Sequence, residues 1–313
     1  MWYLLASVVL GWSLGANNAA SIIGTAVTSQ MLRFRSAVLL ASVFVILGAV
    51  LEGQHGLITV GALANQTIVQ ATVILLAAGL AVGFMTKLKL PVSASQAVVG
   101  AILGAAYLGP GIEWKVLQKI VICWIATPIG AALLSVIFYC ALSRVVERLQ
   151  LNFIGFDRFI RVSLIVCAAY AAYALGANNV ANVTGVFLQA GLLDIFQACL
   201  YGSLAIAFGM LTYSKNVIRT IGHSIVPLNC FGALVVSLST AVTVHVFAKI
   251  GVPVSFSQAV VGAVLGIGFI QGFNLVNAHT ITHIILGWIT APAFAGGAAI
   301  VLTYLSRVRI TIV

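Results

Sequence analysis

Three stretches of this sequence occur twice, in the same order and at nearly the same spacing. LGANNAASIIG, which begins at Leu14, returns as LGANNVANVTG at Leu175. PVSASQAVVGAILG returns as PVSFSQAVVGAVLG, with first residues Pro91 and Pro253, and WIATP at Trp124 returns as WITAP. The three offsets are 161, 162 and 164 residues. A nearly constant offset over three separate blocks indicates two halves of common origin, so we expect a fold built from two similar units.

The composition places such a chain in a membrane. Of its residues, 62% are hydrophobic and only 6% are charged, whereas a soluble domain has roughly 25% charged residues. Several apolar runs reach or approach the roughly 20 residues that a helix needs to cross a bilayer. These runs include residues 37–51, 68–84, 120–142 and 226–246. The net charge of +10 is spread thinly between the runs, so it predicts a lipid bilayer, and not nucleic acid, as the partner.

We expect an all-α polytopic membrane fold with five apolar segments in each half. In an apolar chain, two halves built alike are typical of secondary transporters. Because five is odd, the second half enters the membrane from the opposite side, which predicts inverted-topology repeats with broken or re-entrant helices at the midplane. The second and fourth segments of each half are short for full spans. The segments are expected at residues 4–30, 36–51, 67–86, 91–109 and 117–142, and at 162–190, 195–213, 222–248, 253–270 and 280–305.

The same pattern predicts the domain organisation and the orientation. The first repeat is expected at residues 1–142, a short cytoplasmic linker at 143–161 and the second repeat at 162–313. Cytoplasmic loops of membrane proteins carry an excess of Lys and Arg. With the N-terminus outside, ten basic residues fall on the cytoplasmic side and five on the other. Both termini are therefore predicted to be extracytoplasmic in a multi-pass protein of the cell membrane.

The first duplicated motif places adjacent amides inside an apolar run. Asn17 and Asn18 in one half, and Asn178 and Asn179 in the other, follow a glycine and an alanine. An amide in hydrocarbon is costly unless its hydrogen bonds are satisfied, and glycine followed by paired asparagines makes a poor helix interior. We expect a break in the helix at each pair, with amides and freed backbone groups lining a binding cavity. Hydrogen bonds between helices are the alternative use of these amides.

The second duplicated motif has the features of a helix start. Proline in the first turn, followed by serine, is typical of a helix N-terminus. Such an end presents unpaired N–H groups and the positive end of the helix dipole to an anion. Two ends brought together by symmetry would form a cage of neutral donors suited to a tetrahedral oxyanion, and serine-capped helix starts near the interface are the alternative. The expected donors are Ser93, Ser95, Gln96, Ser255, Ser257 and Gln258.

Charged and metal-ligating residues are scarce. Glu52 ends a long apolar run and is a candidate proton or cation site, with an interfacial position as the alternative; its counterpart in the second half is Tyr213. The five cysteines lie in apolar runs without a CxxC pair, and His279 and His283, four residues apart, have no third ligand nearby. We therefore expect no metal and no cofactor. Because HExxH, GxSxG and paired carboxylates are missing from the sequence, we do not expect an enzyme.

Taken together, the two motif pairs resemble the inorganic phosphate transporter family. Its signature is GANDxAN in each half, with PVSTT followed by His or Gln, and the resemblance extends from Leu14 to Pro292. It implies an inverted-repeat phosphate symporter coupled to Na⁺ or H⁺, with substrate bound between the halves, and it is compatible with a homodimer. The site residues that it implies are Asn17, Asn18, Asn178, Asn179, Asn182, Ser93, Ser95, Gln96, Ser255, Ser257 and Gln258.

The chain departs from this signature at its charged position. The family's Asp is replaced by Asn18 and Asn179, and Ser21 stands where Asn is expected. A carboxylate could give Na⁺ a charged ligand or carry a proton, whereas an amide offers only a neutral oxygen. The expected function is phosphate transport by cation symport, with sulfate transport and a passive anion pathway as alternatives. The coupling-ion candidates are Asn18, Asn179, Asn182 and Glu52, with Na⁺ as one candidate ion.

Overall fold

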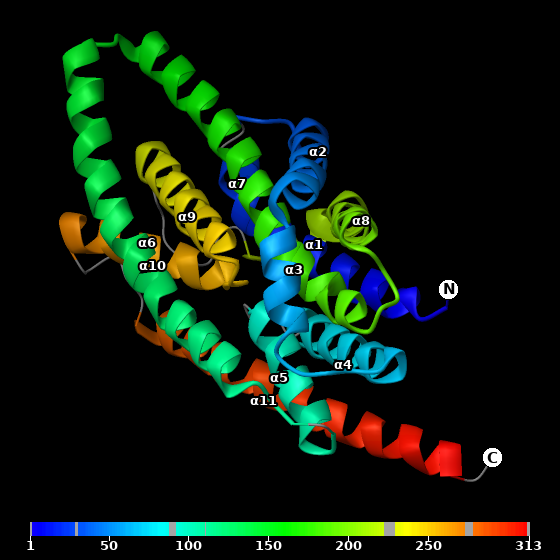
Figure 1. The fold of residues 1–313 in the computed structure, drawn as a ribbon. Coiled ribbons are helices and arrows are strands. Elements are labelled where there is room, and N and C mark those ends of the chain that lie inside the picture. Colours follow the sequence, from blue (N-terminus) through cyan, green and yellow to red (C-terminus); the bar gives the residue numbers. More distant parts are fainter. Residues whose placement is uncertain are drawn as a thin grey trace.

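The structure is a computed structural model that describes residues 2–28, 31–87, 92–109, 111–221, 229–272 and 278–311. Every regular element in these residues is an α-helix (Figure 1). Seven of the described helices are long and apolar enough to cross a membrane, which confirms the all-α polytopic fold. The helices are α1 (Leu4–Thr28), α2 (Phe34–Glu52), α3 (Gln54–Gly61), α4 (Ile68–Lys87), α5 (Ala94–Tyr107), α6 (Trp114–Leu149), α7 (Phe153–Gln189), α8 (Ile195–Ile221), α9 (Cys230–Ile250), α10 (Phe256–Gln271) and α11 (Ala278–Thr311).

The amide pairs do not break their helices. Helices α1 and α7 run without interruption through Asn17–Asn18 and Asn178–Asn179, so the expected breaks are wrong. The physical reason is visible at Asn18, whose amide nitrogen donates to the Leu14 carbonyl oxygen one turn earlier, at 3.1 Å. A side-chain amide can form its hydrogen bonds with its own helix or with a neighbouring helix. The backbone hydrogen bonds of the helix then remain intact.

Of the ten expected segments, the two fourth segments form the short helices in the described part of the chain. The second segments form helices of 19 residues (α2) and 27 residues (α8), so they are long enough to span. Helices α5 and α10 have 14 and 16 residues. A helix of 14 residues is about 21 Å long, which is less than the roughly 30 Å of a hydrocarbon core. Their length makes α5 and α10 the candidates for the re-entrant elements expected in the repeats, and we call them the re-entrant helices.

The segment expected as a linker is mostly helical. Helix α6 continues to Leu149 and α7 begins at Phe153, so only residues 150–152 lie outside helices. Gln150 adopts a left-handed conformation with φ 42°, and Asn152 caps α7 by accepting a hydrogen bond from the Gly155 backbone at 2.8 Å. In Figure 1, α6 and α7 form a V that meets at this turn, with α9 between its arms.

Glycines of each half pack against the backbone of the other half in matched pairs. A Cβ added at Gly15 of α1 would collide with the carbonyl of Ile206 in α8. A Cβ at Gly176 of α7 would collide with the carbonyl of Val45 in α2, which is the same contact moved by the repeat offset. Small residues allow such close approach of helices in membranes. The duplicated sequence therefore folds into two inverted repeats that exchange contacts.

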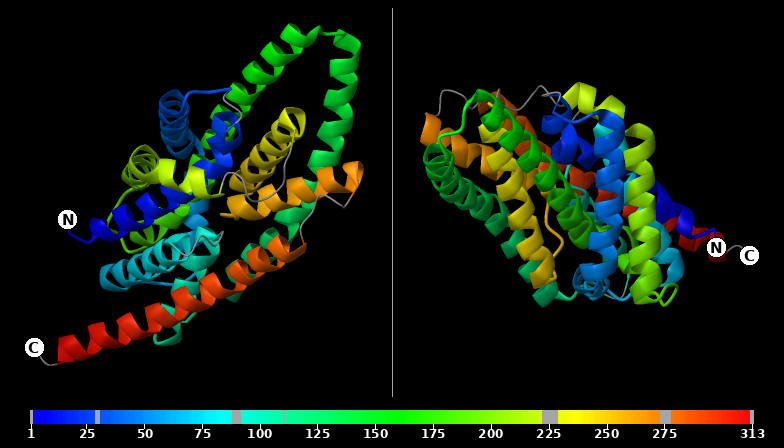
Figure 2. Two further views of the ribbon diagram at one scale, coloured as in Figure 1. Left: turned by 180° about the vertical axis from the view of Figure 1, so that it is seen from behind. Right: turned by 90° about the horizontal axis from the view of Figure 1, so that it is seen from above.

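Glycines of the re-entrant helices also pack against the backbone of the opposite repeat. A Cβ at Gly100 of α5 would collide with the Pro292 backbone of α11, and one at Gly262 of α10 with the Pro128 backbone of α6. Figure 2 shows α11 running along one edge of the molecule, beside α5. Each re-entrant helix is thus held against a long helix of the opposite repeat, and this packing positions its N-terminal end.

We expect Gly15→Ala to separate α1 from α8 and to lower the free energy of unfolding by about 1–3 kcal/mol, as overpacking does in other cores. The measurement is the apparent unfolding temperature in detergent. Gly83→Ala is the matched control, because its added Cβ would meet only the Ser13 hydroxyl of α1, at 3.7 Å. Since alanine favours helix over glycine, the control is expected to be neutral or slightly stabilising. Equal effects of the two substitutions would contradict the proposed packing role.

Candidate substrate site

Both re-entrant helices begin with a serine cap. Ser93 and Ser255 have extended backbones, and their hydroxyl oxygens accept hydrogen bonds from the Gln96 and Gln258 backbone nitrogens, each at 3.3 Å. Pro253 lies two residues before the cap, not in the first turn as expected, and Pro91 lies outside the described residues. As a cap, each serine uses its hydroxyl oxygen as an acceptor, so the cap itself does not use the hydroxyl hydrogen.

The starts of the two re-entrant helices lie side by side. Ser95, in the first turn of α5, donates a hydrogen bond from its hydroxyl to the Val254 carbonyl oxygen at 3.0 Å. Val254 comes directly before the α10 cap, and both residues are buried. We call this meeting point of α5, the 252–255 segment and α7 the junction. Two helix N-termini that meet in a buried place concentrate N–H donors and positive dipole ends there.

Three amides of α7 hold the junction together. The Asn178 side chain makes two hydrogen bonds to the Val254 backbone, donating to its oxygen at 2.8 Å and accepting from its nitrogen at 3.0 Å. The Asn182 amide nitrogen donates to the Ser95 hydroxyl and to the Asn179 side-chain oxygen, both at 2.9 Å. All three amides are almost fully buried, so the structure brings the second-half motif together with both helix starts.

This network determines which way the amides point. The Ser95 hydrogen is used by the Val254 carbonyl, so the Ser95 oxygen must accept, and it can accept only from an amide nitrogen of Asn182. The Asn182 Oδ1 atom is then a buried acceptor without a partner, and the Asn179 Nδ2 atom is a buried donor without one. Buried polar atoms are nearly always hydrogen-bonded. These two unpaired atoms lie on side chains that bond each other, which makes the junction a candidate place for a ligand.

Two glutamine oxygens add to this set. Gln96 Oε1 and Gln258 Oε1 are buried and have no partner, and their residues occupy equivalent positions near the starts of α5 and α10. Ser257 is half-buried, and its hydroxyl oxygen lies 2.9 Å from that of Ser255. The described side chains at the junction are neutral, so a ligand there would meet amides, hydroxyls and helix ends.

The first-half amides are arranged differently. Asn17 donates to the Thr86 hydroxyl of α4 at 2.9 Å, whereas its counterpart Asn178 bonds the backbone of Val254. The position equivalent to Val254 is Val92, and no bond joins Asn17 to it in the described part of the chain. Thr86 was not identified from the sequence, because it belongs to neither duplicated motif. The two halves of the site thus make different hydrogen bonds in this structure.

The structure does not bring Glu52 into the junction. This carboxylate bonds His245 and Lys249 of α9 instead, and it lines a mostly apolar pocket of ≈ 580 Å³ between α2, α7 and α9. His245 and Lys249 escaped sequence analysis because nothing in their spacing relates them to a residue nearly 200 positions away. Their contact exists only through the packing of α2 and α9 on α7.

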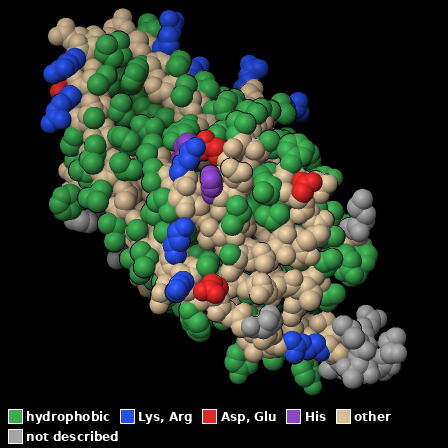
Figure 3. Space-filling model, in the orientation of Figure 1, with side chains coloured by type: hydrophobic (Ala, Val, Ile, Leu, Met, Phe, Trp, Pro, Cys, Tyr) green, Lys and Arg blue, Asp and Glu red, His purple; other side chains and the backbone are tan. Residues whose placement is uncertain are grey.

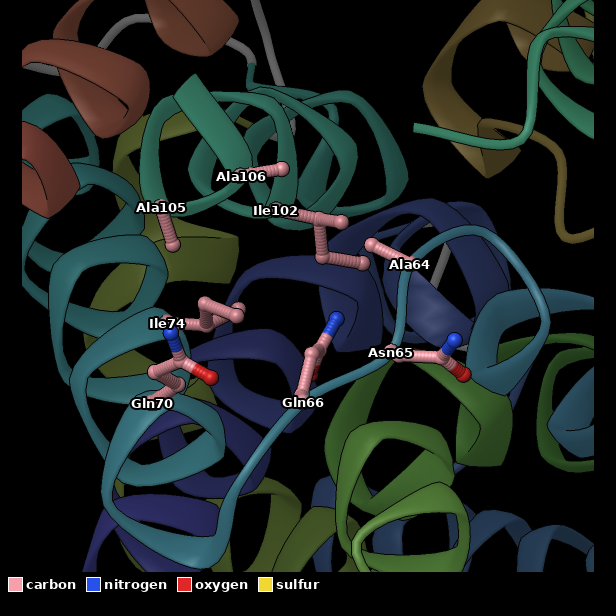
Figure 4. A pocket seen from close by; sticks show the side chains of 8 residues that line it. All are labelled: Ala64, Asn65, Gln66, Gln70, Ile74, Ile102, Ala105 and Ala106. Carbon is pink, nitrogen blue, oxygen red and sulfur yellow. The ribbon is translucent and has the colours of Figure 1, made fainter. Parts of the chain in front are cut away.

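A second described cavity is too small for a substrate. It lies between the 64–66 segment, the start of α4 and the end of α5, and its volume is ≈ 10 Å³. Figure 4 shows the Gln66 amide nitrogen directed toward Ile102, and neither polar atom of this amide has a partner. A space of this size holds about one water molecule.

Comparison with known proteins agrees with this architecture. The model of the phosphate transporter family matches residues 14–154 and again 149–299. A solved structure described as the sodium-dependent phosphate transporter superposes with a TM-score of 0.87, at 23% identity and over 98% of this chain and 100% of the other. This superposition supports the fold.

Two curated relatives cover most of the chain. A protein of Methanocaldococcus jannaschii with the provisional name phosphate permease is 30% identical over 292 residues, covering 93% of each chain. The sulfate permease of Bacillus subtilis is 28% identical over 300 residues, covering 92% of this chain and 83% of its own. Since the family model matches each half in turn over most of the sequence, the chain belongs to the phosphate transporter family.

Proposed function

We propose that the protein is a secondary transporter that moves inorganic phosphate across the cell membrane by cation symport. Membership of the phosphate transporter family supports the substrate class, and the fold shared with a sodium-dependent phosphate transporter is consistent with Na⁺ as a coupling ion. The proposed substrate-binding residues are those of the junction with their first-half counterparts, namely Ser93, Ser95, Gln96, Ser255, Ser257, Gln258, Asn17, Asn18, Asn178 and Asn179. The proposed coupling-ion candidates remain Asn18, Asn179, Asn182 and Glu52.

One observation carries the choice of phosphate. The junction holds an unpaired buried donor, Asn179 Nδ2, together with an unpaired buried acceptor, Asn182 Oδ1. Hydrogen phosphate has oxygens that accept hydrogen bonds and a P–OH group that donates one. Sulfate at neutral pH has acceptors only, so it would leave the Asn182 oxygen without a partner. A site built to bond a substrate hydroxyl can reject an analogue without it by about 10⁴-fold.

Sulfate is the second candidate substrate. The two Asp→Asn departures remove negative charge that would repel a fixed dianion, and one relative is named a sulfate permease. A passive anion pathway is the third reading, because acidic side chains are few in this sequence. We rank phosphate first because hydrogen phosphate offers a P–OH donor to the Asn182 oxygen, whereas sulfate offers none.

In the proposed mechanism, the two repeats alternate between two conformations, so that the site opens to one side of the membrane and then to the other. The anion binds the N-terminal ends of α5 and α10, which supply N–H groups, hydroxyls and amides. In this structure Asn178 holds Val254 while Asn17 bonds Thr86. Inverted repeats can exchange conformations, so opening to the other side would release Asn178 from Val254 and let Asn17 bond Val92.

The test is uptake of labelled phosphate and sulfate into proteoliposomes, each with and without an inward Na⁺ or pH gradient. We expect phosphate uptake that is driven by a cation gradient and that a hundredfold excess of sulfate does not inhibit. If the protein took up sulfate and excluded phosphate, its substrate would be sulfate. Equal rates with and without gradients would show a passive pathway.

A further inference from the structure

A cluster of ionisable side chains ties α2 to α9 across α7. The Glu52 Oε2 atom lies 2.6 Å from His245 Nε2, and its Oε1 atom lies 2.9 Å from Lys249 Nζ. The His245 Nδ1 atom lies 2.7 Å from the Tyr170 hydroxyl. We call these four residues the ion cluster. The Glu52 and His245 side chains are each 20% exposed and that of Lys249 is 57% exposed, so the cluster is accessible from one end.

The hydrogen bonds of the ion cluster can accommodate one additional proton. In the state without it, Tyr170 donates to His245 Nδ1, His245 donates from Nε2–H to Glu52, and Lys249 donates to the other carboxylate oxygen. Every atom then has a suitable partner. A proton added at His245 Nδ1 gives an imidazolium that donates to Glu52 and to Tyr170, provided that the tyrosine hydroxyl turns from donor to acceptor. No other bond has to break.

The fold does not require this charge. At the repeat offsets, Glu52, His245 and Lys249 correspond to Tyr213, Gly83 and Lys87. The equivalent region of the other half is held by uncharged groups, with Trp12 Nε1 donating to the Thr212 hydroxyl at 2.8 Å and the Trp12 and Tyr213 rings 5.2 Å apart. Because the same packing is achieved once without a carboxylate, packing alone does not account for Glu52. Ionisable residues within membrane helices mark proton or ion pathways.

The cluster is connected to the junction by a short piece of backbone. Lys249 is in the last turn of α9, which ends at Gly251 with φ 81°. Val252 donates back to the Phe247 carbonyl at 3.0 Å, and Val254 is already the residue held by Asn178. Other titratable or charged groups near this end are Tyr173 beside Glu52, His55 packed on Gly251, and Lys119, which donates to the Ile250 carbonyl at 3.1 Å.

We propose that the ion cluster is the proton-coupling site, so that one proton crosses with each anion. This inference rests on the proposed transport function and names its coupling ion. On the side where the anion enters, a proton from water binds His245 Nδ1, and its positive charge favours an anion in the neutral junction. After the repeats exchange conformations, the anion leaves and the same proton returns to water on the other side. Figure 3 shows acidic, basic and histidine side chains grouped among apolar ones on this face.

The first experiment separates net transport from exchange in proteoliposomes. Net uptake driven by a pH gradient requires the cluster to gain and lose a proton in each cycle, whereas exchange of external labelled phosphate for internal phosphate requires no net proton movement. We expect Glu52→Gln to reduce net uptake at least tenfold and to keep exchange within about twofold of wild type. Glu113→Gln is the matched control, because this exposed carboxylate lies at the start of α6 outside the cluster, and it should leave both rates unchanged.

The possible outcomes distinguish a failure of the proposed function from a failure of the proton site. Absence of phosphate exchange in the wild-type protein would contradict the proposed function itself. Wild-type exchange together with full gradient-driven net uptake in Glu52→Gln would overturn the proton site alone. Wild-type net uptake that follows a Na⁺ gradient and ignores a pH gradient would also overturn it.

A binding measurement covers the case in which Glu52→Gln does not fold. Calorimetric titration with phosphate in two buffers of different ionisation enthalpy reports the number of protons taken up per anion bound. Because phosphate titrates identically in all samples, the difference between variants isolates the protein's share. We expect His245→Gln to take up about one proton fewer than wild type at the same pH, by linkage between the two sites. An unchanged proton number in a variant that still binds phosphate would overturn the proposal.

Discussion

Replacing Asn182 with leucine is expected to weaken phosphate binding by at least about 100-fold, which corresponds to nearly 3 kcal/mol. The substitution removes two hydrogen bonds, to Ser95 and Asn179, together with the unpaired buried acceptor Asn182 Oδ1. A site that loses a partner for a substrate hydroxyl loses several kcal/mol of binding energy. Leucine has the same branched side-chain shape and number of heavy atoms as asparagine, so α7 should remain helical.

The affinity for phosphate and for sulfate should be measured by competition in the same preparation. We expect the leucine variant to lose its preference for phosphate as well as its affinity, because sulfate never used the Asn182 oxygen. Ser21→Ala is the matched control, since Ser21 occupies the equivalent position in the first half and should change the affinity less than about threefold. If the variant kept an unchanged ratio of the two affinities, the Asn182 acceptor would have no role in selectivity.

Asn178→Ala is expected to cost about 2–4 kcal/mol of unfolding free energy and to abolish uptake. Removal of the amide leaves the buried Val254 N–H without its partner, and a buried unpaired group costs about 1–3 kcal/mol in addition to the lost bonds. The 252–255 segment carries the α10 cap. Freeing it would disorder the start of α10 and with it one side of the substrate site.

The control for this prediction is Asn17→Ala in the other half. Asn17 makes one hydrogen bond, to a threonine hydroxyl that also bonds the Val82 carbonyl, so we expect a loss of about 1 kcal/mol. Thermal unfolding in detergent compares the two variants directly. Equal destabilisation would mean that the difference between the halves seen here does not persist in solution.

The duplicated motifs predicted some of the local structure and missed other parts of it. The sequence correctly predicted helix starts at the two PVSxSQ motifs and short fourth segments, but the second segments proved long enough to span. It predicted wrongly that the amide pairs interrupt α1 and α7. Composition and glycine propensity favour a break, but Gly15 and Gly176 are used for close helix contacts with Ile206 and Val45. Tertiary packing overrides helix propensity in this case.

The sequence by itself determined the membrane environment, the two inverted repeats and the residues proposed for the substrate site, because these depend on composition and on order along the chain. Only the tertiary structure decided which of these residues meet. Asn182 and Ser95 are 87 positions apart, and Glu52 and His245 are 193 apart. Such contacts follow from helices of one repeat packing on those of the other. The orientation of each amide, and with it the unpaired oxygen of Asn182, depends on a hydrogen-bond network that no single segment contains.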